Sequence, residues 1–365
     1  MKRYILLLLS ICLLLCAALE IGTRRALPRL SDIGQRIDSE SESALDIRQG
    51  AGQPDPVLIV GNSLLGAGVD AGVLDASLRP DHRVVRFVLE DTNYLDWYYG
   101  MRKLFRDGAR PKTVLVMLTA RQLGANGIRG DIFGRVLLDP VDVLKVKSDT
   151  GLDNTQAGNL LMASASQFYG FRSEIRKWFV VRLVPDFPTL AASLRPEPPP
   201  LPPDDVLERR IQPRLDRLAR LCRSYGAQLI VILPPDNDDR DGAVAVQRAA
   251  ESTGVPVLIP FGPKELPSDY YSDHFHLNAK GAAVFTQALA TVLRSALPVA
   301  PTQTHSLESL SQVPSAGPES LINSNPSSLL IGHRSTSWTP TSEIKGKIFP
   351  SGDGYVEPRS HIAAF

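Results

Sequence analysis

Short stretches in which nearly every residue is apolar alternate along this chain with longer stretches in which apolar residues recur at helical spacing. An apolar stretch of about four to eight residues is typical of a strand buried in a parallel sheet. We predict five strands, over residues 56–60, 83–89, 113–119, 227–233 and 255–259. We predict helices between and after them, over residues 93–107, 204–225, 242–252 and 278–297. This alternation predicts an α/β domain with a parallel sheet and helices on both faces.

The alternation lapses between about residues 128 and 203. Apolar and amphipathic pieces at 141–146, 157–169 and 175–184 predict a helical insertion, which could form a lid over a site. The insertion ends in a proline-rich stretch, residues 195–203, which we interpret as a stiff connector.

The N-terminus has the pattern of an export signal. Lys2 and Arg3 precede an uncharged apolar run from Tyr4 to Leu19. We interpret residues 1–22 as a signal-anchor, or as a signal peptide cleaved near Ala18. The two cations favour a cytoplasmic N-terminus, which would place the following domain in the periplasm, or release it by secretion if the signal is cleaved. Residues 23–54 are polar and charged, and we interpret them as a spacer that could contain one short helix.

Composition narrows the choice of partners and marks the end of the domain. Lys and Arg number 40 against 39 Asp and Glu, so no basic excess indicates a nucleic-acid partner. The three cysteines cannot form a disulfide framework or a metal cluster. Residues 298–365 are rich in Ser, Pro and Thr, and we predict a disordered tail there.

Three polar residues that follow the first and last strands can form a nucleophilic site. Ser63 comes directly after the first strand, and Asp273 and His276 precede the last helix. The carboxyl ends of parallel strands meet at one edge of the sheet, where ligands bind. An imidazole oriented by a carboxylate is a general base that can activate a serine hydroxyl. Gly61 permits a tight turn there, and the Ser63 amide could face a developing oxyanion.

Other interpretations of these residues are open. A Gly-Asn-Ser turn after a strand is also ordinary turn chemistry. Asp273, His274 and His276 could form part of a metal site, although no further histidine lies nearby in sequence and we predict neither metal nor cofactor.

Two blocks resemble the SGNH (GDSL-type) hydrolase superfamily. Gly61-Asn62-Ser63 is similar to the first block of that family, with Asn62 where the usual motif has Asp. The stretch from Ser272 to Gly281 resembles the last block, Asp-x-x-His followed by Leu-Asn and a Gly. The resemblance implies a flavodoxin-like three-layer α/β/α fold over residues 55–297. It also implies Ser63 as nucleophile, His276 as base and Asp273 as the residue that orients the base.

The intermediate blocks depart from the family pattern. At the second block, Thr92 or Asn93 stands near the place of the usual Gly. At the third, Thr119 or Arg121 stands where the family has an Asn in a Gly-x-Asn-Asp turn. With Gly61 and Asn62, these four residues are the candidates for oxyanion or substrate contacts.

The lone N-terminal anchor and the missing third block resemble the membrane-anchored SGNH branch that modifies cell-envelope polymers. This implies a serine esterase or O-acyltransferase acting on an acylated envelope carbohydrate or another ester. The partners implied are the membrane and an integral-membrane protein that donates the acyl group. The missing third block motivates a second hypothesis, in which the protein is an inactive SGNH-like scaffold that binds envelope polymers or partner proteins.

Overall fold

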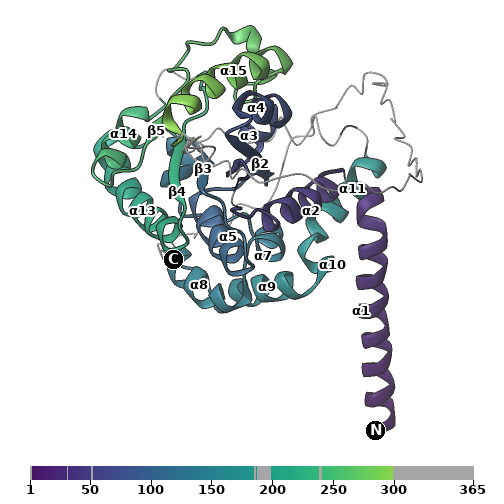
Figure 1. Ribbon diagram of the computed structural model, residues 1–365. Helices are drawn as coiled ribbons and strands as arrows, with labels where there is room; N and C mark the ends of the chain where they lie inside the picture. The colour runs from purple at the N-terminus through teal and green to yellow at the C-terminus, as the bar shows by residue number, and fades with distance from the viewer. Residues whose placement is uncertain are drawn as a thin grey trace, which may run out of the picture. The chain divides into compact units, whose positions relative to one another are not determined.

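The computed structural model describes residues 2–30, 32–50, 52–184, 186, 199–237 and 241–298. Its centre is a parallel sheet of five strands in the order β2-β1-β3-β4-β5 (Figure 1). The strands are β1 (Asp55–Gly61), β2 (His82–Val88), β3 (Thr113–Met117), β4 (Gln228–Ile232) and β5 (Val257–Leu258). All five lie at predicted places, so the prediction of a parallel α/β sheet is confirmed.

Helices cover both faces of the sheet and make the three layers of the expected fold (Figure 1). One face packs on α3 (Ser63–Gly68), α4 (Ala71–Leu78) and α15 (Ala279–Ala296). The other packs on α5 (Tyr94–Arg106), α13 (Asp204–Ser224) and α14 (Ala243–Glu251). Alternate side chains of a strand point to opposite faces. Val57 and Ile59 therefore join the first layer, and Leu58 and Val60 join the second.

The region predicted as a helical insertion consists of short helices where the structure describes it. They are α7 (Asp131–Val136), η1 (Pro140–Asp142), α8 (Val143–Thr150), α9 (Asn154–Ala165), α10 (Gln167–Gly170) and α11 (Arg172–Leu183). Asp142 is fully buried among them and receives the guanidinium groups of Arg102 and Arg106 from α5. These ion pairs fix the insertion to helix α5, which covers one face of the sheet. Residues 195–198 of the proline-rich connector lie outside the described residues.

Two helices precede the sheet. Helix α1 (Lys2–Leu30) is long and apolar enough over Lys2–Ala26 to cross a membrane, by length and composition. Helix α2 (Asp32–Leu45) lies within the segment that we interpreted as a spacer, and this interpretation needs correction. Ile37, Ala44 and Ile47 are buried in the core, and α2 packs on β2.

The polar sequence of α2 conceals its packing because its charges are neutralised by distant residues. Glu40 accepts hydrogen bonds from the Arg86 guanidinium and from the amide of Val88, both at β2. Arg36 pairs with Glu90 just beyond the same strand. The tail that we predict to be disordered lies, from residue 299 onward, outside the described residues.

Two further short elements complete the described fold near the site. They are α6 (Ala120–Gly124), after β3, and η2 (Ser268–Tyr270), after β5.

Candidate active site

Ser63 stands at the carboxyl end of β1, in the first position of α3. Asn62 caps this helix, since its side-chain Oδ1 accepts a hydrogen bond from the amide of Leu64 at 3.1 Å. Gly61 allows β1 and β3 to approach closely, because a Cβ there would lie 2.7 Å from the Met117 carbonyl oxygen. Strand end and helix cap together present the Ser63 side chain at the sheet edge.

Asp273 and His276 lie on one tight loop before α15. The Oδ1 atom of Asp273 accepts hydrogen bonds from the amides of Phe275 at 2.8 Å and His276 at 2.7 Å. Its Oδ2 atom lies 2.8 Å from Nδ1 of His276. The carboxylate therefore shapes the loop and orients the imidazole at the same time.

The loop is held at its far end by the start of α15. Asn278 caps this helix by accepting hydrogen bonds from the amides of Lys280 and Gly281, and its Nδ2 donates to the carbonyl of Asp269. A Cβ on Gly281 would lie 2.3 Å from the Tyr270 carbonyl oxygen. Only glycine fits there, which accounts for the Gly that closes the last sequence block.

The fold brings the two ends of the domain into contact. Nε2 of His276 lies 2.9 Å from Oγ of Ser63. With Asp273 accepting at Nδ1, the other ring nitrogen is left as the acceptor for the serine hydroxyl. Burial raises the pKa of Asp273, but the hydrogen bonds from the amide and ring of His276 and from Phe275 outweigh it, so the pKa lies below its usual value. Asp273 is thus held as the anion.

Asp273 is exposed to solvent, whereas Ser63 and His276 are half-buried. The Asp273 side chain is 47% exposed and that of His276 is 22% exposed. His274 and Phe275, on the same loop, are also exposed and lie edge to face, with ring centroids 5.7 Å apart. Among the residues that the structure describes, no three His, Cys, Asp or Glu side chains gather where they could hold a metal ion.

The structure links the first block to the second through Asn62. Its Nδ2 donates to the carbonyl of Thr92 at 3.0 Å, and the side chain is buried. Thr92 is buried as well, and its hydroxyl donates to the Leu89 carbonyl while accepting from the Trp97 indole. Asn93 caps α5 in a reciprocal pair with Asp96. These side chains build the loop beside Ser63.

The residues at the third block are engaged elsewhere. The side chain of Thr119 accepts from the amide of Gln122, and the Gln122 side chain accepts from the amide of Thr119. Arg121 donates to the carbonyl of Pro199. In the described part of the chain, neither Thr119 nor Arg121 is hydrogen-bonded to Ser63, Asp273 or His276.

Sequence reasoning missed a buried carboxyl group behind the second block. Asp96 is fully buried and accepts hydrogen bonds from the amides of Asn93 and Arg129, both at 2.8 Å. Burial raises the pKa of Asp96 to about 7. Asn93-x-x-Asp96 at a helix start was the available signal, since a capping residue followed three positions later by an acid is a capping pattern.

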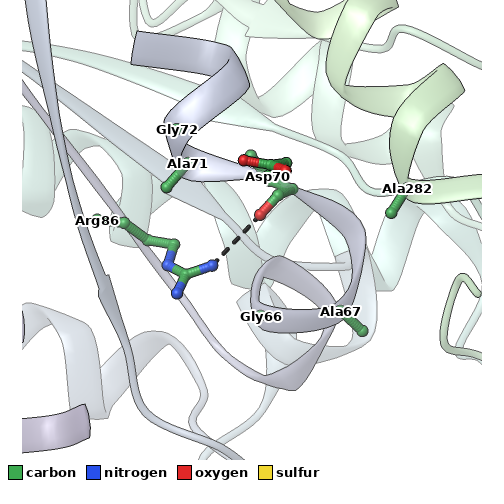
Figure 2. A pocket seen from close by; sticks show the side chains of 8 residues that line it. Gly66, Ala67, Asp70, Ala71, Gly72, Arg86 and Ala282 are labelled. Carbon is green, nitrogen blue, oxygen red and sulfur yellow. Dashed lines mark hydrogen bonds between the residues drawn. The ribbon is translucent and has the colours of Figure 1, made fainter. Parts of the chain in front are cut away.

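A shallow hollow lies one turn along α3 from Ser63. Its volume is about 400 Å³, and its lining includes Gly66, Asp70, Arg86 and Ala282 (Figure 2). The Arg86 guanidinium donates to the carbonyl of Val69 at 3.3 Å and is paired with Glu40. The charge of Arg86 is thus already neutralised.

The strand order, the serine turn after β1 and the Asp-x-x-His loop before the last helix agree with the fold that the resemblance to the SGNH (GDSL-type) hydrolases implies. No protein-family model matches the sequence, and a search of curated proteins gives no match.

Three of the solved structures that are similar to this chain are compared with it here by sequence identity, coverage and TM-score. A GDSL-like lipase from Bacteroides thetaiotaomicron is 12% identical, with 72% of this chain and 98% of that chain covered and a TM-score of 0.36. TesA is 13% identical, with 66% and 99% covered and a TM-score of 0.34. An acetylxylan esterase from Geobacillus stearothermophilus is 13% identical, with 67% and 95% covered and a TM-score of 0.33. At such low identity, the activity has to be argued from the site itself.

Proposed function

We propose that this protein is a membrane-anchored serine esterase or O-acyltransferase of the SGNH type, acting on an ester of a cell-envelope carbohydrate or polymer. The observation that carries the proposal is the chain of two contacts from Asp273 through His276 to Ser63, at 2.8 and 2.9 Å. This is the geometry of a nucleophile, a base and the group that orients the base.

The residues would act in two steps. His276 takes the proton of Ser63 through Nε2 while Oγ attacks the ester carbonyl, and Asp273 stabilises the imidazolium. His276 then returns the proton to the leaving alcohol, which leaves an acyl-enzyme on Ser63. In the second half, His276 deprotonates water or a sugar hydroxyl, that oxygen takes the acyl group from Ser63, and His276 returns the proton to Oγ of Ser63.

The backbone supplies an oxyanion donor. The amide of Ser63 is the first of α3, and the first N–H groups of a helix have no acceptor within it. It can therefore face the negative charge that develops on the carbonyl oxygen. The side chains of Thr92 and Thr119 are bonded within their own turns, and Asn62 is bonded to the Thr92 carbonyl, so we assign these three residues to building the site.

The exposure of the site supports a bulky substrate with a small acyl group. Asp273 is exposed and His276 is half-buried, and the pocket along α3 is shallow and lined by Asp70 and Arg86 as well as by small residues. A polymer chain can reach such a surface, whereas a long acyl chain would need an enclosed apolar pocket. We therefore propose a short acyl group on a carbohydrate.

The anchor supports the proposed location. Lys2 and Arg3 precede the apolar part of α1, which favours a cytoplasmic N-terminus and an extracytoplasmic domain. A domain held at the outer surface could receive acyl groups from an integral-membrane donor protein. In that case the sugar hydroxyl takes the place of water in the second step.

Turnover of an activated acetyl ester by the full chain and by Ser63→Ala tests the proposal. We expect a loss of about 10³-fold or more in Ser63→Ala, with Ser224→Ala, on an exposed position of α13, as the matched control. Unchanged turnover in Ser63→Ala would overturn the enzyme proposal. Absence of turnover in both forms would favour the inactive scaffold.

A further inference from the structure

Helix α9 has two apolar faces, and only one of them is covered. Ala157, Leu160 and Ala163 are buried, and α9 packs on α7 within the insertion. Gly158, Leu161, Met162 and Ala165 are exposed, and their spacing of three and four residues places them on one stripe of the helix. Leu161 is 49% exposed and Met162 is 53% exposed. We call these four residues the α9 stripe.

The end of the α9 stripe is joined directly to α1, at the residue that follows the uncharged apolar run 4–19. Glu20 of α1 accepts hydrogen bonds from the hydroxyl of Ser166 at 2.8 Å and from the amides of Gln167 and Phe168 at 3.0 and 3.2 Å. Ser166 is the residue that follows α9. The first charged residue after the apolar run thus holds the C-terminal end of α9.

The contact at Glu20 places the α9 stripe near the level of the lipid headgroups. The apolar run Tyr4–Leu19 has 16 residues and rises about 24 Å, somewhat less than the roughly 30 Å of the hydrocarbon core. Glu20 is the first charged residue after this run, so it stands near the boundary between hydrocarbon and headgroups. Leu161 and Met162 precede Ser166 by five and four residues, so they lie within about 6 to 8 Å of helix from the residue that Glu20 holds.

Helix α8 extends the same edge of the domain, where α8, α9 and α10 follow one another (Figure 1). Val141, just before α8, and Leu144 within it are exposed, and the adjacent Lys145 is exposed too. Lys145 pairs with Asp142, whose charge Arg102 and Arg106 already neutralise. Exposed apolar side chains beside a lysine match the composition of surfaces that bind anionic phospholipids.

We propose that the α9 stripe lies on the membrane surface, with Leu161 and Met162 inserted among phospholipid headgroups. The inference rests on the proposed anchoring by α1. It adds a second contact with lipid, which would stop the domain from rotating freely about its anchor and would fix the orientation of the Ser63 site relative to the bilayer.

Depth-dependent fluorescence quenching in the full chain tests this inference. The chain is reconstituted in vesicles of phosphatidylcholine and phosphatidylglycerol that carry a nitroxide near the headgroup or deep in the acyl chain. A thiol-reactive fluorophore is placed at Leu161→Cys, at Met162→Cys or, as the matched control, at Val244→Cys on α14, which is 48% exposed. These variants carry Cys12→Ala and Cys16→Ala. The remaining Cys222 is buried, which raises the pKa of its thiol to about 12 and keeps it unreactive.

A fourth sample keeps the native Cys16 and carries only Cys12→Ala, so that its label reports on the anchor. We expect the shallow nitroxide to quench the labels at 161 and 162 several-fold more than the label at 244, and the deep nitroxide to quench the label at Cys16. Retained reaction of Ser63 with a phosphonate probe confirms that each variant is folded.

Each other outcome overturns the inference in a different way. If Cys16 is quenched but positions 161 and 162 behave like 244, the anchoring stands and the surface contact is wrong. If positions 161 and 162 are shielded from water but not quenched, the α9 stripe packs on protein, such as a second copy of this chain. If Cys16 is not quenched either, the anchoring itself fails and the inference fails with it.

Discussion

Oγ of Ser63 and Nε2 of His276 lie 2.9 Å apart although 213 positions of sequence separate the two residues. The contact depends on two helix starts, that of α3 after β1 and that of α15 after the Asp273 loop. The parallel strands β1 and β5, which precede these two helix starts along the chain, end at the same edge of the sheet. The predictions below follow from how this contact is held.

Asp273→Asn tests the orientation of the imidazole. An amide cannot stabilise the imidazolium as a carboxylate does, and it can hold the wrong tautomer. We expect kcat on an activated acetyl ester to fall by about 10²- to 10⁴-fold, with little change in KM. A loss smaller than threefold in a variant with wild-type thermal stability would show that Asp273 does not orient His276.

Asn62→Asp tests the link between the serine turn and the second block. The Nδ2 group of Asn62 donates to the Thr92 carbonyl, and an ionised carboxylate in its place would face that carbonyl without a proton. We expect a cost of about 1–3 kcal/mol in the free energy of unfolding, and lower turnover. Denaturant unfolding of both proteins in detergent measures the cost, and a variant as stable as the wild type would contradict this role.

Gly281→Ala tests the close packing of α15 on the loop. The new Cβ would lie 2.3 Å from the Tyr270 carbonyl, so α15 or the loop must shift and carry Asp273 and His276 with it. We expect both the thermal midpoint and the turnover to fall. Gly158→Ala is the control, because a Cβ there meets no atom within 4 Å and alanine favours the helix. Equal effects of the two substitutions would count against the packing argument.

Asp96→Asn tests the buried carboxyl behind Asn93. The pKa of Asp96 is raised from 3.8 to about 7, so between pH 4 and 7 the folded protein keeps a proton that the unfolded chain has lost. The contribution of this group to stability is therefore present at low pH and is lost as the pH rises towards 7. Relative to the Asn variant, the wild type should lose about 2–4 kcal/mol between pH 4 and pH 8.

Thermal midpoints of both proteins in detergent across this pH range check the sign. If the difference between them does not change with pH, Asp96 is ionised throughout and burial does not control its pKa. If the difference grows in favour of the wild type as the pH rises, its hydrogen bonds with the amides of Asn93 and Arg129 outweigh its burial.

The strands could be predicted because burial on both faces leaves an uninterrupted apolar run, as in residues 57–60. The packing of helix α2 against the sheet could not be predicted, because few of its residues enter the core and its charge pattern is that of a solvated segment. The partners of Glu40 and Arg36 lie at and just beyond β2, about fifty positions away. The local pattern of apolar and charged residues contains no information about ion pairs between residues so far apart in the sequence.

The same distinction applies to the site. Ser63, Asp273 and His276 were placed together because strand ends share an edge, which is a consequence of topology. The donors of the second and third blocks could not be assigned because Thr92, Thr119 and Gln122 bond to neighbours in their own turns. Sequence spacing does not distinguish a side chain that caps a helix from one that faces a substrate.

Labelling of the full chain with a serine-reactive phosphonate, followed by mapping of the modified peptide, tests the central claim most directly. The probe reacts only with a serine whose proton a neighbouring base removes. We predict that Ser63 is the modified residue, and that labelling is lost in His276→Ala and slowed in Asp273→Asn. Modification of another serine, or the absence of any reaction in folded protein, would contradict the account.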